Sequence, residues 1–461
     1  MADRTKAILT KLRPSVPSDP GSQKVFEFQL RLSESQWTPR QQLEQIQLGH
    51  LKRLVRFAQQ EVPFWRARAL ADQVERATDL GQALSALPIT SRSDLQDHSA
   101  ALRAEKLPGG HLPGGERTSS GSTGMAVTVM STNVMLAWQD ALTFRAYLWA
   151  GFDFSRSIAI IRRQKEGAAE HPDGVQLPRW DTLSVFPFPT GPSMRLTTHR
   201  TSLDQQWEWL GRNAPAYLVT YPSVVRGLAQ HAAQTGTRPA ALKGILTLGE
   251  VVDSDLRELA VKQLEAPIHD LYSSEEAGCM AIQCPSCRLY HVQAEAMILE
   301  ILDEKDRPCR SGEMGRVVVT PLFSYATPLI RYDIGDFAES GAHCACGRGL
   351  PVLNRINGRR RNLLKLPDGR LYWPSTGGHR LHRIVPIRQH QFRQIAPNVI
   401  EALLVTNEPI SPQQETELRH IIASNIPVPF EIRILRVPEI PRGAGGKYEE
   451  FLSMIETGPK G

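Results

Sequence analysis

The chain has 461 residues, enough for two or three domains with large buried cores. Its composition, 41% hydrophobic and 22% charged, is ordinary for a globular protein. This composition excludes a collagen and a coiled coil, and the lack of an apolar run near the ~18 residues that a membrane span needs excludes an integral membrane protein. The net charge of +6 suits a phosphate-rich partner, which leaves nucleic acid, an anionic surface and a nucleotide open.

The N-terminal region is charged and then helical. It lacks an apolar segment followed by a small-residue cleavage site, so we expect no secretion signal and a cytoplasmic location. From about 37 to 70, apolar residues recur at helical spacing, and Pro63 is expected to end the pattern. A Gly- and Pro-rich stretch at 107–115 and a Ser/Thr/Gly cluster at 118–124 then interrupt regular structure.

The middle of the chain alternates between strand and helix patterns. The apolar run 216–219 and the segments 244–248 and 267–272 are typical of strands, and the stretches between them are helical, the second with Asp253 or Ser254 as its N-cap. This alternation predicts a parallel sheet with right-handed crossovers.

The carboxyl ends of these strands should lie at one edge of the sheet, where ligands bind in such folds. The residues at those ends are Tyr221 with Pro222, Gly249 with Glu250, and the segment 272–276. We therefore expect three separate segments to converge on one site, with Tyr221 and Pro222 facing the substrate.

From Ala296 onward, short apolar runs joined by turns indicate antiparallel strands. We place a domain boundary near Gly358, which gives a large N-terminal domain, 1–357, and a small mobile C-terminal domain, 358–461, with an α+β pattern. The predicted fold class is α/β, with parallel and mixed sheets in the large domain. Residues 354–390 hold nine Arg or Lys and one Asp, so the junction carries much of the positive charge.

The cluster Thr118-Ser-Ser-Gly-Ser-Thr-Gly124 offers hydroxyls and backbone amides that can bind a polyphosphate. It is not a Walker A loop, because it lacks the terminal Gly-Lys-Ser/Thr and precedes a strand pattern instead of a helix. Taken alone, such a run is more often a flexible turn.

Four further motifs follow in order: Tyr272-Ser-Ser-Glu-Glu276-Ala-Gly278, Arg331-Tyr-Asp-Ile-Gly-Asp336, Gly358-Arg-Arg-Arg-Asn-Leu-Leu-Lys365 and Pro441-Arg-Gly-Ala-Gly-Gly-Lys447. Together with the loop, they resemble the adenylate-forming superfamily of acyl-CoA synthetases and adenylation domains, and more closely its phenylacetate-CoA ligase branch. The resemblance spans 62–447 and implies the adenylate-forming enzyme fold. The sequence departs from the family pattern at Met125, Glu275, Arg361 and Asn362.

The resemblance also implies roles for individual residues. Glu276 would hold Mg²⁺, and Lys447 would reach from the small domain to the carboxylate and α-phosphate, where negative charge builds up. Tyr272 would pack on adenine, Asp336 would accept hydrogen bonds from the ribose, and Arg359 would bind the nucleotide at the hinge. The residues predicted to bind ATP are Ser119, Ser120, Gly121, Ser122, Thr123, Gly124, Gly249, Glu250, Tyr272, Ser273, Asp336 and Arg359.

The implied reaction is the ATP-dependent activation of a carboxylic acid, for which an aromatic acid is the preferred class, to an acyl-adenylate. The acyl group then passes to the thiol of coenzyme A or of a carrier protein's phosphopantetheine. Rotation of the small domain would withdraw Lys447 between the half-reactions. An alternative is an adenylating enzyme that passes the acyl group to an amine or leaves an adenylylated product. A homodimer is left open.

Four of the six cysteines form two close pairs, Cys284 with Cys287 and Cys344 with Cys346, and His291 is near enough to replace one of them. Sets of four S or N ligands are typical of structural Zn²⁺, so we expect a structural zinc site. The sequence does not decide which residue is the fourth ligand. A zinc-ribbon module that binds nucleic acid is the non-enzymatic alternative. We do not favour it, because the basic run lacks the interleaved aromatic residues of a base-stacking surface.

Overall fold

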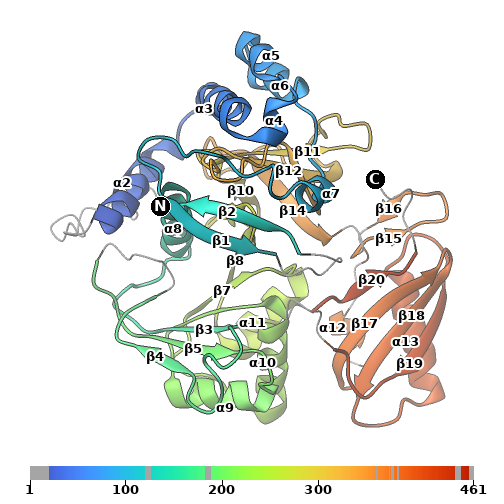
Figure 1. Ribbon diagram of the computed structural model, residues 1–461. Coiled ribbons are helices and arrows are strands. Elements are labelled where there is room, and N and C mark those ends of the chain that lie inside the picture. Colours follow the sequence, from blue (N-terminus) through green and yellow to red (C-terminus); the bar gives the residue numbers. More distant parts are fainter. Residues whose placement is uncertain are drawn as a thin grey trace.

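The computed structural model describes residues 20–119, 126–181, 188–359, 362–372, 374, 378–381, 384–441 and 448–455. In this part of the chain, one large mixed sheet forms the body of the molecule and a smaller sheet lies beside it (Figure 1). The predicted phosphate-loop residues Ser120, Gly121, Ser122, Thr123 and Gly124 lie outside the described residues, as does Lys447.

Helices cover the N-terminal part of the fold. They are α2 (Pro20–Ser35), α3 (Arg40–Glu61), α4 (Pro63–Arg66), α5 (Ala71–Arg76), α6 (Leu80–Ser85) and α7 (Arg92–Asp97). Helix α3 ends at Glu61 because Val62 is extended and Pro63 cannot donate the next helical hydrogen bond, which confirms the predicted stop. The buried faces of α3 to α7 pack on the antiparallel half of the large sheet.

The predicted strand and helix alternation is confirmed in the elements β6 (Tyr217–Thr220), α10 (Pro222–Thr235), β7 (Gly244–Leu248), α11 (Ser254–Leu264) and β8 (Ile268–Ser274). Asp253 is the N-cap of α11, where its carboxylate accepts a 2.6 Å hydrogen bond from the Leu256 amide. Strands β6, β7 and β8 are parallel neighbours, so their carboxyl ends lie at one edge.

The parallel half of the sheet continues through β3 (Ile158–Arg162) and β5 (Ser193–Thr197) to an antiparallel edge strand, β4 (Val175–Leu177). Helix α9 (Leu203–Asn213) joins α10 and α11 in one core on this half. Helices α2 and α8 (Asn133–Trp149) contribute to a second core with strand residues such as Ile160 and Leu246. Buried helices on both sides explain why the central strands β3, β6 and β7 are nearly continuous apolar runs.

The other half of the large sheet is antiparallel, as predicted. From the edge inward its order is β11 (Met297–Leu302), β12 (Met314–Pro321), β13 (Tyr332–Ser340), β14 (Val352–Arg359), β10 (Tyr290–Val292) and β9 (Gly278–Gln283), which pairs with β8. A separate hairpin of β1 (Pro113–Thr118) and β2 (Thr128–Thr132) flanks the predicted phosphate loop.

The small sheet has the order β19 (Glu431–Arg436), β18 (Val399–Thr406), β17 (Ile387–Ala396) and β20 (Phe451–Ser453). Helix α13 (Pro412–Ser424) connects β18 to β19, and the unit has its own core. Shorter elements are β15 (Leu364–Lys365), β16 (Leu371–Tyr372) and α12 (Gly378–Leu381). Strand β14 ends at Arg359, beside the predicted boundary at Gly358, and the division into two domains there stays a prediction.

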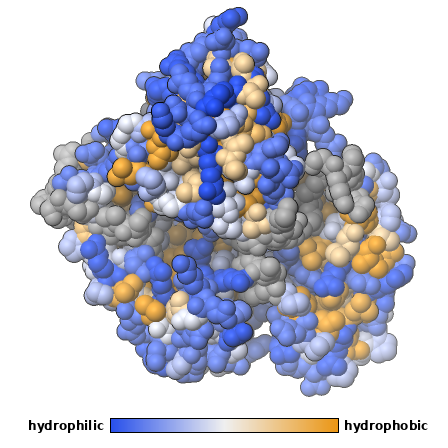
Figure 2. Space-filling model, viewed as in Figure 1, coloured by the Kyte–Doolittle hydropathy of each residue, from blue (hydrophilic) through white to orange (hydrophobic). Residues whose placement is uncertain are grey.

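The visible surface around the large sheet is mostly hydrophilic, and apolar residues gather on the small sheet (Figure 2). Among the described residues, we find no helix with the length and apolar character needed to cross a membrane.

Candidate active site

The carboxyl ends of β6, β7 and β8 bring three predicted segments to one edge of the large sheet, as expected. Tyr221 is the N-cap of α10 and Pro222 is its first residue, Gly249 and Glu250 follow β7, and Tyr272 and Ser273 lie near the end of β8. Gly249 has a φ of +82°, a left-handed conformation that glycine adopts without strain.

Asp336 lies at the centre of a buried polar cluster. The Tyr272 hydroxyl donates a 2.8 Å hydrogen bond to Asp336 Oδ2, and Arg359 Nε lies 3.0 Å from Asp336 Oδ1. Residues 336 and 359 are direct partners across β13 and β14, so the antiparallel register itself places them together. The structure thus brings three of the predicted nucleotide-binding residues into contact.

Burial and charge shift the titration of this cluster. Burial and then the neighbouring Asp336 carboxylate raise the pKa of Tyr272 well above its usual value. The same carboxylate raises the pKa of Arg359 against the opposing effect of burial. At neutral pH, Tyr272 is therefore a neutral hydrogen-bond donor and Arg359 is a fixed cation.

Glu276 is 2% exposed and lies in the turn between β8 and β9. Its Oε1 lies 3.3 Å from Arg92 Nη1, and Arg92 Nη2 donates a 3.0 Å hydrogen bond to the Ser119 hydroxyl. The Ser119 hydroxyl also accepts a 2.9 Å hydrogen bond from the Val127 amide. Arg92 therefore links the predicted magnesium ligand to the first residue of the predicted phosphate loop.

The sequence gives no warning of this role for Arg92. It is the first residue of α7, after the capping residue Ser91, and it belongs to no motif or periodic pattern. The ion pair joins residues 184 positions apart in the chain, so only the fold reveals it.

Glu250 has protein partners in this structure. Its Oε2 accepts a 2.8 Å hydrogen bond from the Ser223 amide, and its Oε1 accepts bonds from the Ser223 hydroxyl at 3.1 Å and the Tyr448 amide at 2.7 Å. The residue directly after the predicted catalytic Lys447 therefore contacts the predicted nucleotide site.

The sequence allows four aromatic residues, Trp180, Phe186, Phe188 and Tyr221, either near the substrate pocket or in the core, and the described ones belong to the core. Trp180 is 1% exposed, and both it and Phe188 pack against Phe154 with ring centroids 5.2 Å apart. Phe186 lies outside the described residues. Tyr221 is buried in the core of α9, α10 and α11, and the predicted substrate role of Tyr221 and Pro222 stays a prediction.

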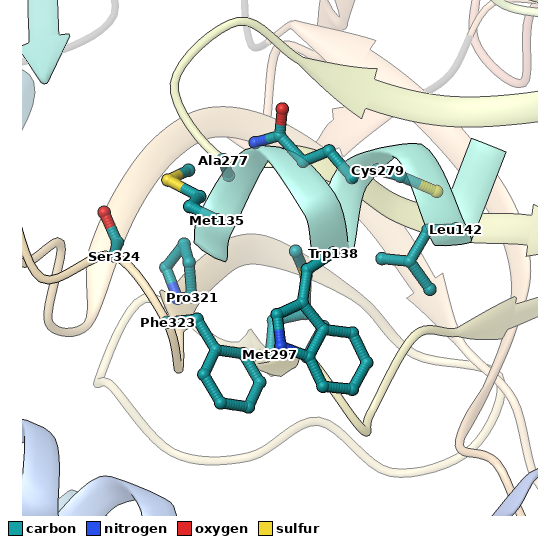
Figure 3. A pocket seen from close by; sticks show the side chains of 11 residues that line it. Met135, Trp138, Leu142, Ala277, Cys279, Met297, Pro321, Phe323 and Ser324 are labelled. Carbon is teal, nitrogen blue, oxygen red and sulfur yellow. The ribbon is translucent and has the colours of Figure 1, made fainter. Parts of the chain in front are cut away.

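A shallow hollow, partly open to solvent, is lined in part by Ala277, the residue after Glu276. Its lining is mostly apolar and comes from α8, the start of β9, the start of β11 and the end of β12 with the residues next to these strands: Met135, Trp138, Gln139, Leu142, Ala277, Cys279, Ala296, Met297, Pro321, Phe323 and Ser324 (Figure 3). The Trp138 and Phe323 rings are stacked with centroids 4.7 Å apart. Phe28 also stacks on Trp138, with centroids 4.4 Å apart, so this ring already packs against two aromatic side chains of the protein.

A thiol and imidazole cluster lies between two turns of the antiparallel sheet. The ligand atoms of Cys284, His291, Cys344 and Cys346 all lie within 4.8 Å of one another. Cys284 Sγ and Cys344 Sγ are 3.5 Å apart, and Cys346 Sγ lies 3.2 Å from His291 Nε2. These separations are close to the roughly 3.5 Å between ligands of a tetrahedral zinc site and too long for a disulfide.

The donor chemistry of this cluster also suits zinc. Burial lowers the pKa of His291 to about 4, so its imidazole is neutral and can act as a ligand at pH 7. Burial raises the pKa of Cys284, an effect opposed by a hydrogen bond from the Ser286 amide, so a buried thiolate there needs a cation. Cys287 lies outside the four-residue set, although its Sγ is 3.4 Å from Cys344 Sγ.

The fold is that of the adenylate-forming CoA ligases. A solved structure of 2-hydroxyisobutyryl-CoA ligase in the postadenylation state, in complex with R3-HIB-AMP, superposes with a TM-score of 0.72 at 17% identity and 90% coverage of each chain. The same enzyme with 2-HIB-AMP and CoA in the thioesterification state gives a TM-score of 0.58 at 18% identity and 90% coverage of each chain. The predicted fold class is confirmed.

A phenylacetate-coenzyme A ligase of Thermus thermophilus is 24% identical over 458 residues, which cover 91% of this chain and 98% of that protein. No family model matches the sequence. The recognition of an adenylate-forming chain similar to the phenylacetate-CoA ligase branch is therefore confirmed. This fold favours the enzymatic interpretation over the zinc-ribbon alternative.

Proposed function

We propose that this chain activates a carboxylic acid with ATP to an acyl-adenylate, releases pyrophosphate, and transfers the acyl group to a thiol. The observation that supports this most directly is the cluster of Tyr272, Asp336 and Arg359 at the edge of the sheet, beside Glu276, in a fold shared with CoA ligases. The acid oxygen would attack the α-phosphate, and pyrophosphate would leave with the electron pair of the broken P–O bond.

The described residues supply binding and charge for this step. Asp336 accepts a hydrogen bond from Tyr272 on Oδ2 and forms an ion pair with Arg359 through Oδ1. A carboxylate can accept further hydrogen bonds from ribose hydroxyls. Glu276 and Ser119 would hold the metal-bound polyphosphate, with Arg92 orienting both. Mg²⁺, when bound there, would offset the charge that develops as pyrophosphate leaves.

The acid is proposed to be aromatic. The support for this class is the similar ligase of Thermus thermophilus, whose name specifies phenylacetate. A panel of aryl and alkyl acids in an ATP-pyrophosphate exchange assay tests both proposals. We expect exchange with aryl acids above exchange with short alkyl acids; a panel that supports no exchange would overturn the function.

The acceptor is proposed to be coenzyme A, with a carrier protein's phosphopantetheine as the second candidate. The amine alternative gives the same pyrophosphate exchange, so the assay that separates them is AMP release that depends on added thiol. A homodimer and a cytoplasmic location stay predictions.

Asp336→Asn is expected to raise the KM for ATP by about tenfold or more, because a hydrogen bond to a charged group contributes roughly 1.5–3 kcal/mol. The measurement is exchange rate against ATP concentration. Asp333→Asn is the matched control, since Asp333 lies on the same strand and pairs with Arg316 at 2.6 Å. Equal effects of the two substitutions would contradict a nucleotide role for Asp336.

We also propose that Cys284, His291, Cys344 and Cys346 bind one structural Zn²⁺. The cluster connects the turn after β9 to the turn between β13 and β14. Four protein ligands leave no open position, so the ion would hold these turns together and take no part in the reaction.

A further inference from the structure

Residues 448–450, called here the docking segment, join the small sheet to the large one. On the large sheet, Glu250 Oε1 accepts a 2.7 Å hydrogen bond from the Tyr448 amide. Glu250 is itself held by Ser223, whose amide donates to Oε2 at 2.8 Å. The carboxylate at the end of β7 therefore binds the backbone of the docking segment.

A second contact is an ion pair through Arg226 on α10. Its Nε lies 3.1 Å from Glu450 Oε1, and its Nη2 lies 2.6 Å from Asp253 Oδ2. The Arg226 side chain is only 13% exposed, so this guanidinium is shielded from water and its two carboxylate partners matter more than at an open surface. Burial opposes the charged form, yet Glu450 and Asp253 raise the pKa of Arg226.

The docking segment is also fixed to the small sheet. The Gln391 side chain donates a 2.9 Å hydrogen bond to the Glu449 carbonyl, and the Phe392 amide donates a 2.8 Å bond to the Glu450 carbonyl. Asn362, directly after the basic run of the predicted hinge, donates a 2.7 Å bond to the Phe451 carbonyl. Whatever holds the docking segment on the large sheet therefore holds the small sheet as well.

We propose that Glu250 and Arg226 are positioning residues for the adenylation half-reaction. They hold the docking segment, which follows Lys447 directly in the chain, against the edge of the sheet where the nucleotide cluster lies. Thiol transfer requires their release, because the small domain must move to admit the thiol. This inference rests on the proposed function, and it gives Glu250 a protein partner in place of its predicted contact with ATP.

The test uses two substitutions, each of which removes the negative charge of one carboxylate that pairs with Arg226. Glu450→Gln breaks the pair between the small sheet and α10, and Asp253→Asn breaks the pair within the large domain while asparagine still caps α11. Each full-length variant is assayed for ATP-pyrophosphate exchange and, separately, for transfer from purified acyl-adenylate to thiol.

Glu450→Gln is expected to lower the kcat of exchange at least tenfold, with KM for ATP and acid within twofold of wild type. Its rate of transfer from the adenylate should be unchanged or higher. Asp253→Asn should change either rate by less than about threefold. Unchanged exchange in Glu450→Gln, or equal losses in both half-reactions, would overturn the proposal.

Amide hydrogen exchange provides a readout that does not depend on activity. The peptide that contains residues 448–453 should exchange faster in Glu450→Gln than in wild type or Asp253→Asn, because the Tyr448 amide loses its acceptor more often. Equal protection in all three proteins would overturn the docking contacts. If wild type supports no pyrophosphate exchange with any acid, the proposed function fails, and the amide exchange result still decides the docking.

Discussion

Replacing Lys447 with alanine is expected to lower the rate of ATP-pyrophosphate exchange by about a thousandfold. A cation beside the α-phosphate stabilises charge that develops only in the transition state, and loss of one such group typically costs about 10²–10³ in rate. Lys447 lies outside the described residues, but the amide of the next residue, Tyr448, donates a 2.7 Å hydrogen bond to Glu250. Glu250 lies at the same edge of the sheet as Tyr272, near the end of β8. The measurement is exchange under saturating ATP and acid.

The same substitution should leave the second half-reaction nearly intact. In that step the thiol attacks the acyl-adenylate and AMP leaves, so the acid no longer has to approach the α-phosphate and the lysine is not needed to offset their repulsion. Transfer from purified acyl-adenylate is therefore the internal control. Lys305→Ala, which changes an exposed lysine in the turn after β11 that belongs to none of the motifs, is the matched charge control and should exchange at the wild-type rate. Exchange within tenfold of wild type in Lys447→Ala would contradict the role that we assign to this residue.

The periodic parts of the fold could be predicted from the sequence. The apolar runs at 216–219 and 244–248 and the strand-like segment at 267–272, separated by helical patterns, predict neighbouring strands of a parallel sheet, and the structure places them as parallel neighbours. The same pattern correctly predicted that Glu250 and Tyr272 would lie at one edge. Tyr272, Asp336 and Arg359 were predicted from ordered motifs, and their mutual contact needed the register of β13 and β14.

Contacts between distant segments could not be predicted in this way. Arg92 carries no periodic or motif signal, yet it binds both Glu276 and Ser119. From the sequence, Trp180 could lie either in the substrate pocket or in the core, and its burial and its packing against Phe154 show that it belongs to the core. Which of the five candidate ligands surround a metal likewise depends on three-dimensional spacing, because the sequence offers one thiol or imidazole more than the four ligands that a structural zinc takes.

The other large effect is expected from the thiol and imidazole cluster. The cluster joins the turn after β9 to the turn before β14, and these two strands flank the site, since Glu276 precedes β9 and Arg359 ends β14. Cys344→Ser should release one equivalent of zinc and lower the melting temperature by roughly 5–10 °C, because a lost ligand leaves buried donors without their cation. Zinc content by elemental mass spectrometry and calorimetry measure these effects.

Three further substitutions make this prediction specific. Cys309→Ser changes a thiol outside the cluster and should keep both the zinc and the melting temperature. Cys287→Ser should also keep zinc, because the four-residue set is complete without it. Zinc loss in Cys287→Ser together with retention in His291→Ala would replace the set with four thiolates. A purified wild-type protein without zinc, or a Cys344→Ser variant that melts with wild type, would contradict a structural ion, since the antiparallel sheet would then hold these turns without one.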